Sequence, residues 1–116
     1  MMAWLMGLKT VAPTELEALL RERRAFAFDV NARGNFQQAH VPGAVHLDPE
    51  TFQAQQLPDD HSSLLVFYCS NPLCRKAPNA ALRARSLGYT DARVMSAGIK
   101  GWIGAGMPVE AAAAER

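Results

Sequence analysis

Short apolar runs alternate along the chain with segments in which apolar residues recur every three or four positions. A short continuous apolar run bounded by turn-forming residues is typical of a buried strand, whereas the longer period is typical of a helix. The clearest run is LLVFY, which ends at Cys69. The predicted strands are residues 10–12, 25–30, 44–47, 64–68 and 93–95.

Four segments between these runs are predicted to be helical. The first begins at PTELE, where Thr14 is the expected N-cap and Glu17, three residues later, completes a capping box. The third, residues 78–87, is followed by Gly88, at the position where a helix C-terminal glycine is expected. The segment through Gly34 and Pro42 is predicted to be a loop. The other predicted helices are residues 49–56, 78–87 and 99–104.

The order of these elements indicates the fold class. Strands that alternate with helices pair in parallel through right-handed crossovers, which predicts a three-layer α/β domain. The chain has 116 residues, of which 49% are hydrophobic, enough for one domain with a core. We therefore expect a single domain over residues 1–116, with residues 1–8 and 110–116 as peripheral or frayed ends.

Charge and composition exclude several classes of partner. Twelve Lys and Arg residues against eleven Asp and Glu give a net charge of +1, which argues against binding to nucleic acid or to an anionic membrane. The longest apolar run is far shorter than the roughly 20 residues that span a bilayer. We expect a cytoplasmic protein with reduced thiols that is a monomer or a weak homodimer.

The cysteine and histidine content argues against a metal site. Two cysteines are too few for a disulfide scaffold or for zinc held by four thiolates. His40, His46 and His61, taken with the two cysteines, have spacings that fit no common zinc pattern. The sequence therefore predicts no metal site.

Cys69 is the strongest candidate for chemistry. It follows the most apolar strand and begins the loop CSNPLCR, of the form C-x5-R, which leads into a helix. In parallel α/β sheets, ligands bind beyond the carboxyl ends of the strands. The N–H groups of a loop that turns from a strand into a helix often form a nest for an anion. Lowering the pKa of a free thiol from about 8.5 to about 6.5 requires about 2.7 kcal/mol, which one or two charge-assisted N–H bonds supply. The predicted substrate-binding residues are Ser70, Asn71, Leu73, Cys74, Arg75 and Lys76.

The two cysteines each have an alternative interpretation. A cysteine at a strand end is often only a small buried apolar side chain, so Cys69 is also compatible with a purely structural role. Cys74, five positions later, is either a resolving thiol that forms a disulfide or receives a persulfide, or a side chain packed under the loop.

Three stretches resemble the rhodanese family of single-domain sulfurtransferases. DVNARGNFQQAHVPGA at residues 29–44 resembles the family's D-V-R-x-x-x-E-F-x-x-G-H-I-P-G-A. VFYC at residues 66–69, followed by AA and then LGY, resembles its active-cysteine strand and the helix behind it. AGIKGW at residues 97–102, followed by GMPV, resembles the closing G-G-x-x-x-W and G-x-P-V.

The resemblance implies a five-stranded parallel sheet between helices, with Cys69 as the nucleophile. In the family's reaction, the thiolate attacks the outer sulfur of thiosulfate, sulfite leaves and a persulfide forms. The sulfur then passes to cyanide or to a thiol, which is covalent catalysis in two half-reactions. The implied partners are a small anionic sulfur substrate and a thiol acceptor, without a cofactor.

The chain also departs from the family pattern. Asn31 and Asn35 stand where the family has Arg and Glu, which alters a local ion pair. The cysteine loop is two residues longer than in compact sulfurtransferases and resembles that of rhodanese-fold phosphatases and arsenate reductases. However, Tyr68 stands where those phosphatases have His, and the loop lacks an acidic residue. The alternatives to a sulfurtransferase are therefore a phosphatase or arsenate reductase, and a non-catalytic sulfur carrier or regulatory module.

Overall fold

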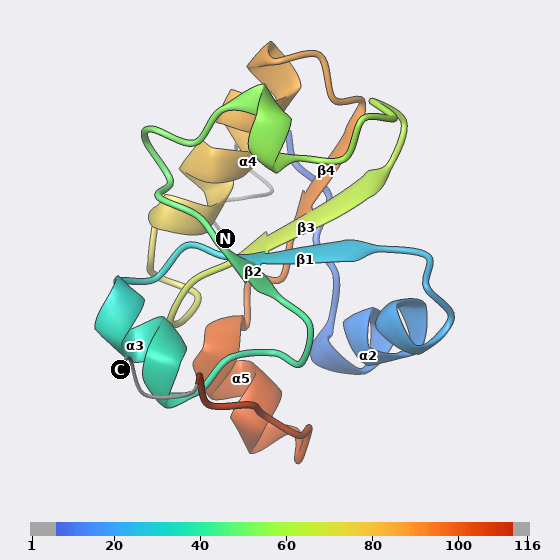
Figure 1. Cartoon of the computed structure of the whole chain (residues 1–116). Helices are drawn as coiled ribbons and strands as arrows, with labels where there is room; N and C mark the ends of the chain where they lie inside the picture. Colours follow the sequence, from blue (N-terminus) through green and yellow to red (C-terminus); the bar gives the residue numbers. More distant parts are fainter. Residues whose placement is uncertain (1–6, 113–116) are drawn as a thin grey trace.

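The computed structural model describes residues 7–112 and contains a parallel sheet of four strands (Figure 1). In chain order these are β1 (Phe26–Asp29), β2 (Val45–His46), β3 (Leu64–Tyr68) and β4 (Asp91–Val94). Their spatial order is β2-β1-β3-β4, and all neighbours are parallel. The α/β class is confirmed, and β3 has the predicted bounds.

The fifth strand is missing from the sheet of the described residues, in contrast to the five-stranded prediction. Where it was expected, at residues 10–12, only an isolated bridge joins Thr10 to Val94. The amide of Val11 donates to the carbonyl of Val94, whose own amide donates to the carbonyl of Lys9. Pairing stops there because helix α2 (Pro13–Arg21) begins at a proline, which has no N–H to extend the ladder.

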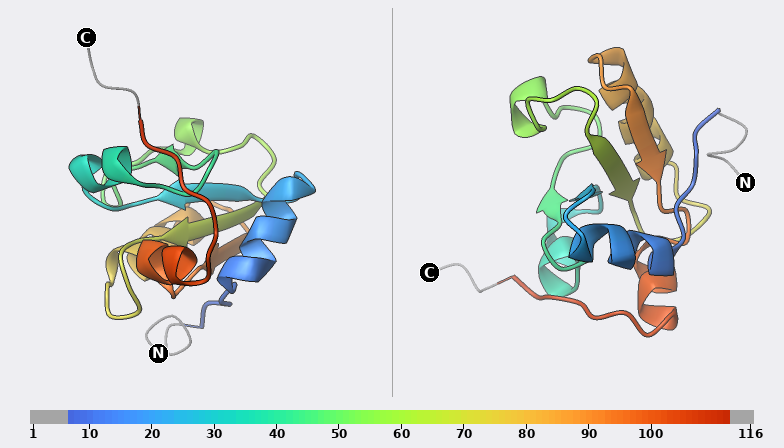
Figure 2. Two further views of the ribbon diagram at one scale, coloured as in Figure 1. Left: turned by 90° about the horizontal axis from the view of Figure 1, so that it is seen from below. Right: turned by 90° about the vertical axis from the view of Figure 1, so that its right-hand side faces the viewer.

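Helices cover both faces of the sheet. Alternate residues of β3 point to opposite sides, so that Phe67 and Cys69 pack with α4 (Lys76–Ser86), whereas Val66 and Tyr68 pack with α2 and α5 (Gly98–Gly104). Figures 1 and 2 show α4 and the short 3-10 helix η1 (Ala54–Gln56) on one side of the strands, and α2 and α5 on the other. The three-layer arrangement predicted from the sequence is therefore present.

The start of α2 differs from the predicted capping box. Ala12 is the N-cap, and its N–H donates to the carboxylate of Glu15 at 3.3 Å. Thr14 lies inside the first turn, and Glu17 instead pairs with Arg21 at 2.8 Å. The shift occurs because a proline is well suited to the first helical position.

Two further segments differ from prediction. Residues 33–38, predicted as a loop, form helix α3 (Arg33–Gln38); none of its residues is buried, so the helix leaves no apolar period in the sequence. Residues 49–56, predicted as a helix, contain only η1, because the Asp48 carboxylate accepts hydrogen bonds from the amides of Glu50 and Thr51 and forms a turn. Helix α4 begins two residues earlier than predicted.

Parts of both predicted peripheral ends belong to the fold. Leu8 is buried in the core beside α4. Glu110 pairs with His40 in an antiparallel bridge, and the amide of Ala112 donates to the carbonyl of Gln37. For these described residues the prediction was wrong, because the contacts join segments about 70 residues apart. Trp4 lies outside the described residues.

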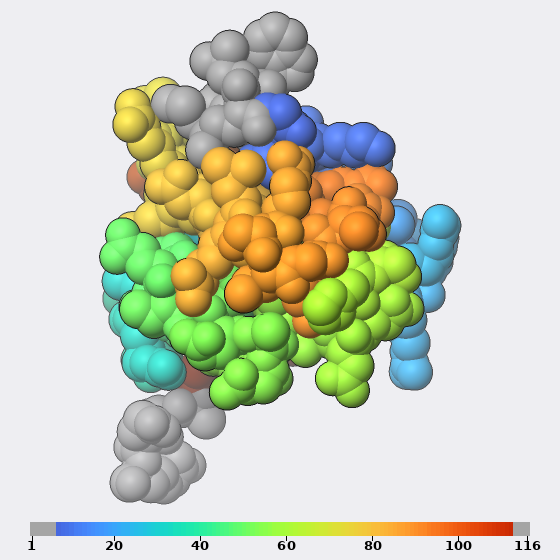
Figure 3. Space-filling model, turned by 90° about the horizontal axis from the view of Figure 1, so that it is seen from above, coloured from blue at the N-terminus to red at the C-terminus, as the bar shows by residue number. Residues whose placement is uncertain are grey.

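The segment before β3 packs on the end of α4. Figure 3 shows the green residues around η1 against the orange residues that follow α4. The Arg83 guanidinium donates to the carbonyl of Phe52 at 2.7 Å, and the Tyr89 hydroxyl donates to the carbonyl of Pro58.

Trp102, predicted as a packing residue, is fully buried in α5 on the opposite face. Among the described residues, no helix is long and apolar enough to cross a membrane.

We expect Tyr68→Phe to destabilise the protein by about 1–3 kcal/mol, the usual cost of leaving a buried polar group unpaired. The buried Tyr68 hydroxyl accepts a hydrogen bond from the amide of Val41 at 3.0 Å, and that amide loses its partner in the variant. Urea denaturation gives the change. Tyr89→Phe is the control, with a smaller expected loss because the Pro58 carbonyl is only partly buried. Equal losses would contradict the prediction.

Candidate active site

Cys69 lies at the carboxyl end of β3, where the strand passes into the loop of residues 69–76, called here the cysteine loop. The first turn of α5 lies against this loop. The amide of Ile99 donates to the carbonyl of Cys69 at 2.9 Å, and the amide of Lys100 donates to the carbonyl of Ser70 at 3.1 Å. Two segments that are 30 residues apart therefore fix the start of the loop together.

Gly98 permits this close approach. Its φ is +70°, in the left-handed region that favours glycine. A Cβ atom built on Gly98 would lie 2.5 Å from the carbonyl carbon and oxygen of Ser70 and 2.6 Å from the amide nitrogen of Asn71. No larger residue fits without displacing the backbone of the cysteine loop.

Asn71 organises the middle of the loop. Its side-chain oxygen accepts a hydrogen bond from the amide of Leu73 at 2.9 Å, and its carbonyl accepts one from the amide of Cys74 at 3.1 Å. These two N–H groups are thus used within the loop. The amides that interact with the cysteine sulfurs are those of Ser70, Lys76 and Ala77. The nest is smaller than the sequence predicts, because the turn at Asn71 takes two of its donors.

The two cysteines form a pair with unequal exposure. Cys69 is buried, with 2% of its surface exposed, whereas Cys74 is half-buried and packs against the same core cluster. The Cys69 thiol interacts with the Cys74 sulfur. Both cysteines are free thiols. The loop therefore places a buried sulfur next to a more exposed one.

The electrostatics of the pair differ from the prediction for Cys69. Burial and the neighbouring Cys74 raise the pKa of the Cys69 thiol to about 12, although the amides of Ala77 and Ser70 oppose this effect. Burial also acts on Cys74, but the Cys69 thiol, the amides of Lys76 and Ser70 and the Lys76 ammonium together lower the pKa of Cys74. Negative charge is thus favoured on the more exposed sulfur.

Two other predicted site residues are exposed. Leu73 is 89% exposed, and Arg75 is exposed at the N-cap of α4. Within residues 7–112, the Arg75 side chain has neither a hydrogen bond nor an ion pair. The loop of the form C-x5-R therefore does not turn its arginine inward in this structure, because Arg75 already belongs to the start of α4.

Asn31 contacts the cysteine loop, a role that the sequence did not reveal. It is buried, and its side-chain oxygen accepts a hydrogen bond from the Ser70 hydroxyl at 2.7 Å. The Asp29 carboxylate accepts from the amide of Asn31 at 2.8 Å, which confirms the predicted structural role of Asp29. The carbonyl of Asn31 also lies 2.7 Å from Nε2 of His46. The position of Asn31 just after a predicted strand, at the carboxyl edge of the sheet, was the sequence signal that could have indicated this contact.

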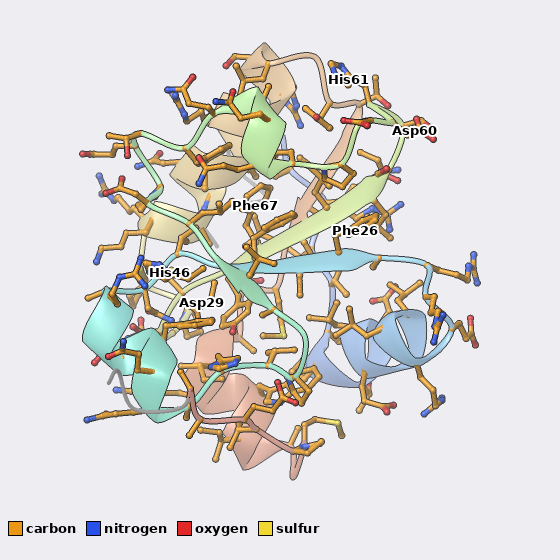
Figure 4. The ribbon with its side chains drawn as sticks, in the orientation of Figure 1. Phe26, Asp29, His46, Asp60, His61 and Phe67 are labelled. Atoms are coloured by element: carbon orange, nitrogen blue, oxygen red, sulfur yellow. The ribbon has the colours of Figure 1, made fainter. Side chains whose placement is uncertain are left out.

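Figure 4 shows Asp29 and His46 at this edge, near α3, and His61 and Asp60 at the other end of the molecule. His61 stacks on the ring of Tyr89, far from the cysteine loop. His40, predicted to brace its loop, has Nδ1 at 2.7 Å from the carbonyl of Phe36. Within residues 7–112, no group of three or more His, Cys, Asp and Glu side chains is placed to hold a metal ion.

Two clefts flank the cysteine loop. The larger has a volume of about 600 Å³, and Lys76 lies in its wall. The smaller has a volume of about 390 Å³, and Ser70 and Asn71 lie in its wall. Asn31 lines both clefts. Other polar residues of the larger cleft are Arg33, His46, Asp48, Glu50 and Gln56.

A parallel α/β domain in which a cysteine ends the central strand and a loop leads to a helix is the arrangement of a rhodanese-type domain. Comparison with known families agrees, because the model of the rhodanese-like domain matches residues 12–105. The chain therefore belongs to the rhodanese-like domain family.

Among known proteins, the chain is similar to human thiosulfate:glutathione sulfurtransferase, with 33% identity over 84% of this chain and 95% of that protein. The solved structure of the human single-domain sulfurtransferase has a TM-score of 0.69 and 28% identity, and the match covers 82% of this chain and 95% of that chain. The BH2092 protein of Bacillus halodurans has a TM-score of 0.81, with 19% identity over 89% of this chain and 77% of that chain, which shows the fold alone. These relationships support a function of the sulfurtransferase type.

We expect Gly98→Ala to lower the free energy of unfolding by more than about 1 kcal/mol, because the added methyl group combines left-handed strain with a clash against Ser70. Gly106→Ala is the matched control: its φ is +78°, but nothing lies within 4 Å of an added Cβ. Urea denaturation compares the two variants. An equal loss in both would show that the contact with the cysteine loop has no effect.

In the wild-type protein, we expect iodoacetamide to modify Cys74 before Cys69. The pKa of Cys74 is lowered, so its reactive thiolate is present above that lowered pKa and is lost as the pH falls through it. Cys69, with a pKa of about 12, stays protonated across the neutral range. Mass mapping of the modified peptide at a series of pH values measures both rates. The fast phase should disappear in Cys74→Ser, and faster modification of Cys69 would contradict the assignment.

Proposed function

We propose that this protein is a sulfurtransferase that moves a sulfane sulfur from thiosulfate or a persulfide donor to a thiol or cyanide through a persulfide on Cys69. The observation that carries the proposal is the position of Cys69, in a rhodanese-like domain, at the end of the central strand beneath the amides of Ser70 and Ala77. The name of the human relative, thiosulfate:glutathione sulfurtransferase, supports both the donor and the thiol acceptor.

In the first half-reaction, the Cys69 sulfur attacks the outer sulfur of the donor, and the thiol proton passes to the departing sulfite. The S–S bond of thiosulfate breaks, sulfite leaves with the electron pair, and a Cys69 persulfide remains. Lys76, with Arg75 beside it, supplies positive charge for the anionic donor. Ser70 and Asn71 line the adjoining cleft. Cys74 lies beside Cys69 in the same loop, and Leu73 stays exposed at its surface.

The arrangement favours sulfur over phosphate or arsenate chemistry. A cysteine phosphatase requires a ring of donors around a tetrahedral oxyanion. Here the amides of Leu73 and Cys74 are used by Asn71 and are not free for such a ring. Attack on the outer sulfur of a donor places one sulfur atom beside the loop and requires fewer donors. Since the reaction uses reduced thiols, we place the protein in the cytoplasm.

The test is incubation of the protein with thiosulfate, measurement of the intact mass and then addition of cyanide. We expect a gain of one sulfur atom, mapped to Cys69, and continuous formation of thiocyanate. In Cys69→Ser, the atom that forms the bond is absent, so turnover should fall by about a hundredfold or more. Cys69→Ala is a second variant, and circular dichroism verifies that both variants fold.

The other outcomes separate the alternatives. A gain of sulfur without turnover indicates a sulfur carrier. If no sulfur is gained and an aryl phosphate or arsenate is consumed instead, the protein belongs to the phosphatase or arsenate reductase class.

A further inference from the structure

The buried position of Cys69 poses a problem for a large acceptor. Only 2% of Cys69 is exposed, whereas Cys74, which interacts with it and packs against the same core cluster, is only half-buried. The small cyanide ion needs little space to attack a sulfur at this depth. A thiol carried on a peptide needs more room, and the half-buried Cys74 is the sulfur that it meets first.

Charge also favours movement of the outer sulfur toward the surface. A persulfide ionises more readily than a thiol, so the outer sulfur carries negative charge near neutral pH. Amides stabilise that charge at both sulfurs, but burial opposes it more strongly at the almost fully buried Cys69 than at the half-buried Cys74, where the Lys76 ammonium adds to the stabilisation. Transfer from Cys69 to Cys74 therefore takes the charge to the better-stabilised position.

The cleft of about 600 Å³ provides a place for the acceptor at the end of the cysteine loop. Lys76 connects this cleft with Cys74, since Lys76 lines the cleft and its amide interacts with the Cys74 sulfur. The volume lies in the range of small-molecule sites. Arg33 provides a second cation, and Asp48 and Glu50 provide anions. Both signs of charge suit a small peptide thiol, which has carboxylates and an ammonium group.

We propose that Cys74 takes the outer sulfur from the Cys69 persulfide and delivers it to a zwitterionic peptide thiol bound in this cleft. The proposal rests on the proposed function. The Cys74 sulfur attacks the outer sulfur, a new S–S bond forms at Cys74, and the S–S bond at Cys69 breaks. Cys69 keeps the electron pair and takes the proton that Cys74 gives up. The acceptor thiol then attacks in the same way, so no external oxidant or reductant is needed.

The experiment uses protein that is loaded with thiosulfate and freed of excess donor. The loss of bound sulfur is then timed with reduced glutathione and, separately, with cyanide. In Cys74→Ser and Cys74→Ala, we expect the ratio of the glutathione rate to the cyanide rate to fall by about tenfold or more relative to wild type. A ratio that stays at the wild-type value in folded variants overturns the relay.

Two further measurements test the relay and the cleft separately. Alkylation of loaded wild-type protein should trap sulfur on Cys74 as well as on Cys69, and sulfur on Cys69 alone overturns the relay. Arg33→Gln should raise the KM for glutathione about threefold or more, with no change for cyanide, because a rim charge contributes modestly to binding. An unchanged KM overturns the placement of the acceptor. If wild-type protein fails to load at all, the proposed function itself fails.

Discussion

The cysteine loop keeps its shape because the backbone of α5 lies directly against it. Hydrogen bonds from Ile99 and Lys100 hold the carbonyls of Cys69 and Ser70, and Gly98 has no side chain to separate the two segments. The positions of both sulfurs follow from this contact, since the loop turns from β3 into α4 over only a few residues. The site therefore depends on packing between segments that are distant in the sequence.

Within this loop, two thiols of the same intrinsic chemistry acquire opposite properties. Cys69 follows a buried strand and lies in the core cluster, so burial makes the charged form of its thiol costly. Cys74 shares the same surroundings only in part, and it gains hydrogen bonds from amides and the field of Lys76. The pair thus combines a sheltered sulfur with an accessible one, which suits the storage of a reactive sulfur atom and its delivery.

Segments with a strong apolar pattern were predicted well. The run of β3 had to be a buried strand, and the buried alanines of α4, such as Ala80 and Ala84, had to lie on one helix face. Helix α3 was missed because it buries none of its residues and so has no apolar stripe. The predicted fifth strand forms only an isolated bridge, because Pro13 ends the pairing after a few hydrogen bonds.

The sequence by itself determined the order of strands and helices and the place of Cys69 at the end of a buried strand, because apolar periodicity and turn residues act locally. It did not determine which sulfur is accessible or which amides face it. Those properties depend on Asn31, which bonds Ser70 from 39 positions away, and on Gly98. Burial and local dielectric are set by every segment that packs around an atom, so only the tertiary structure decided where negative charge is stable.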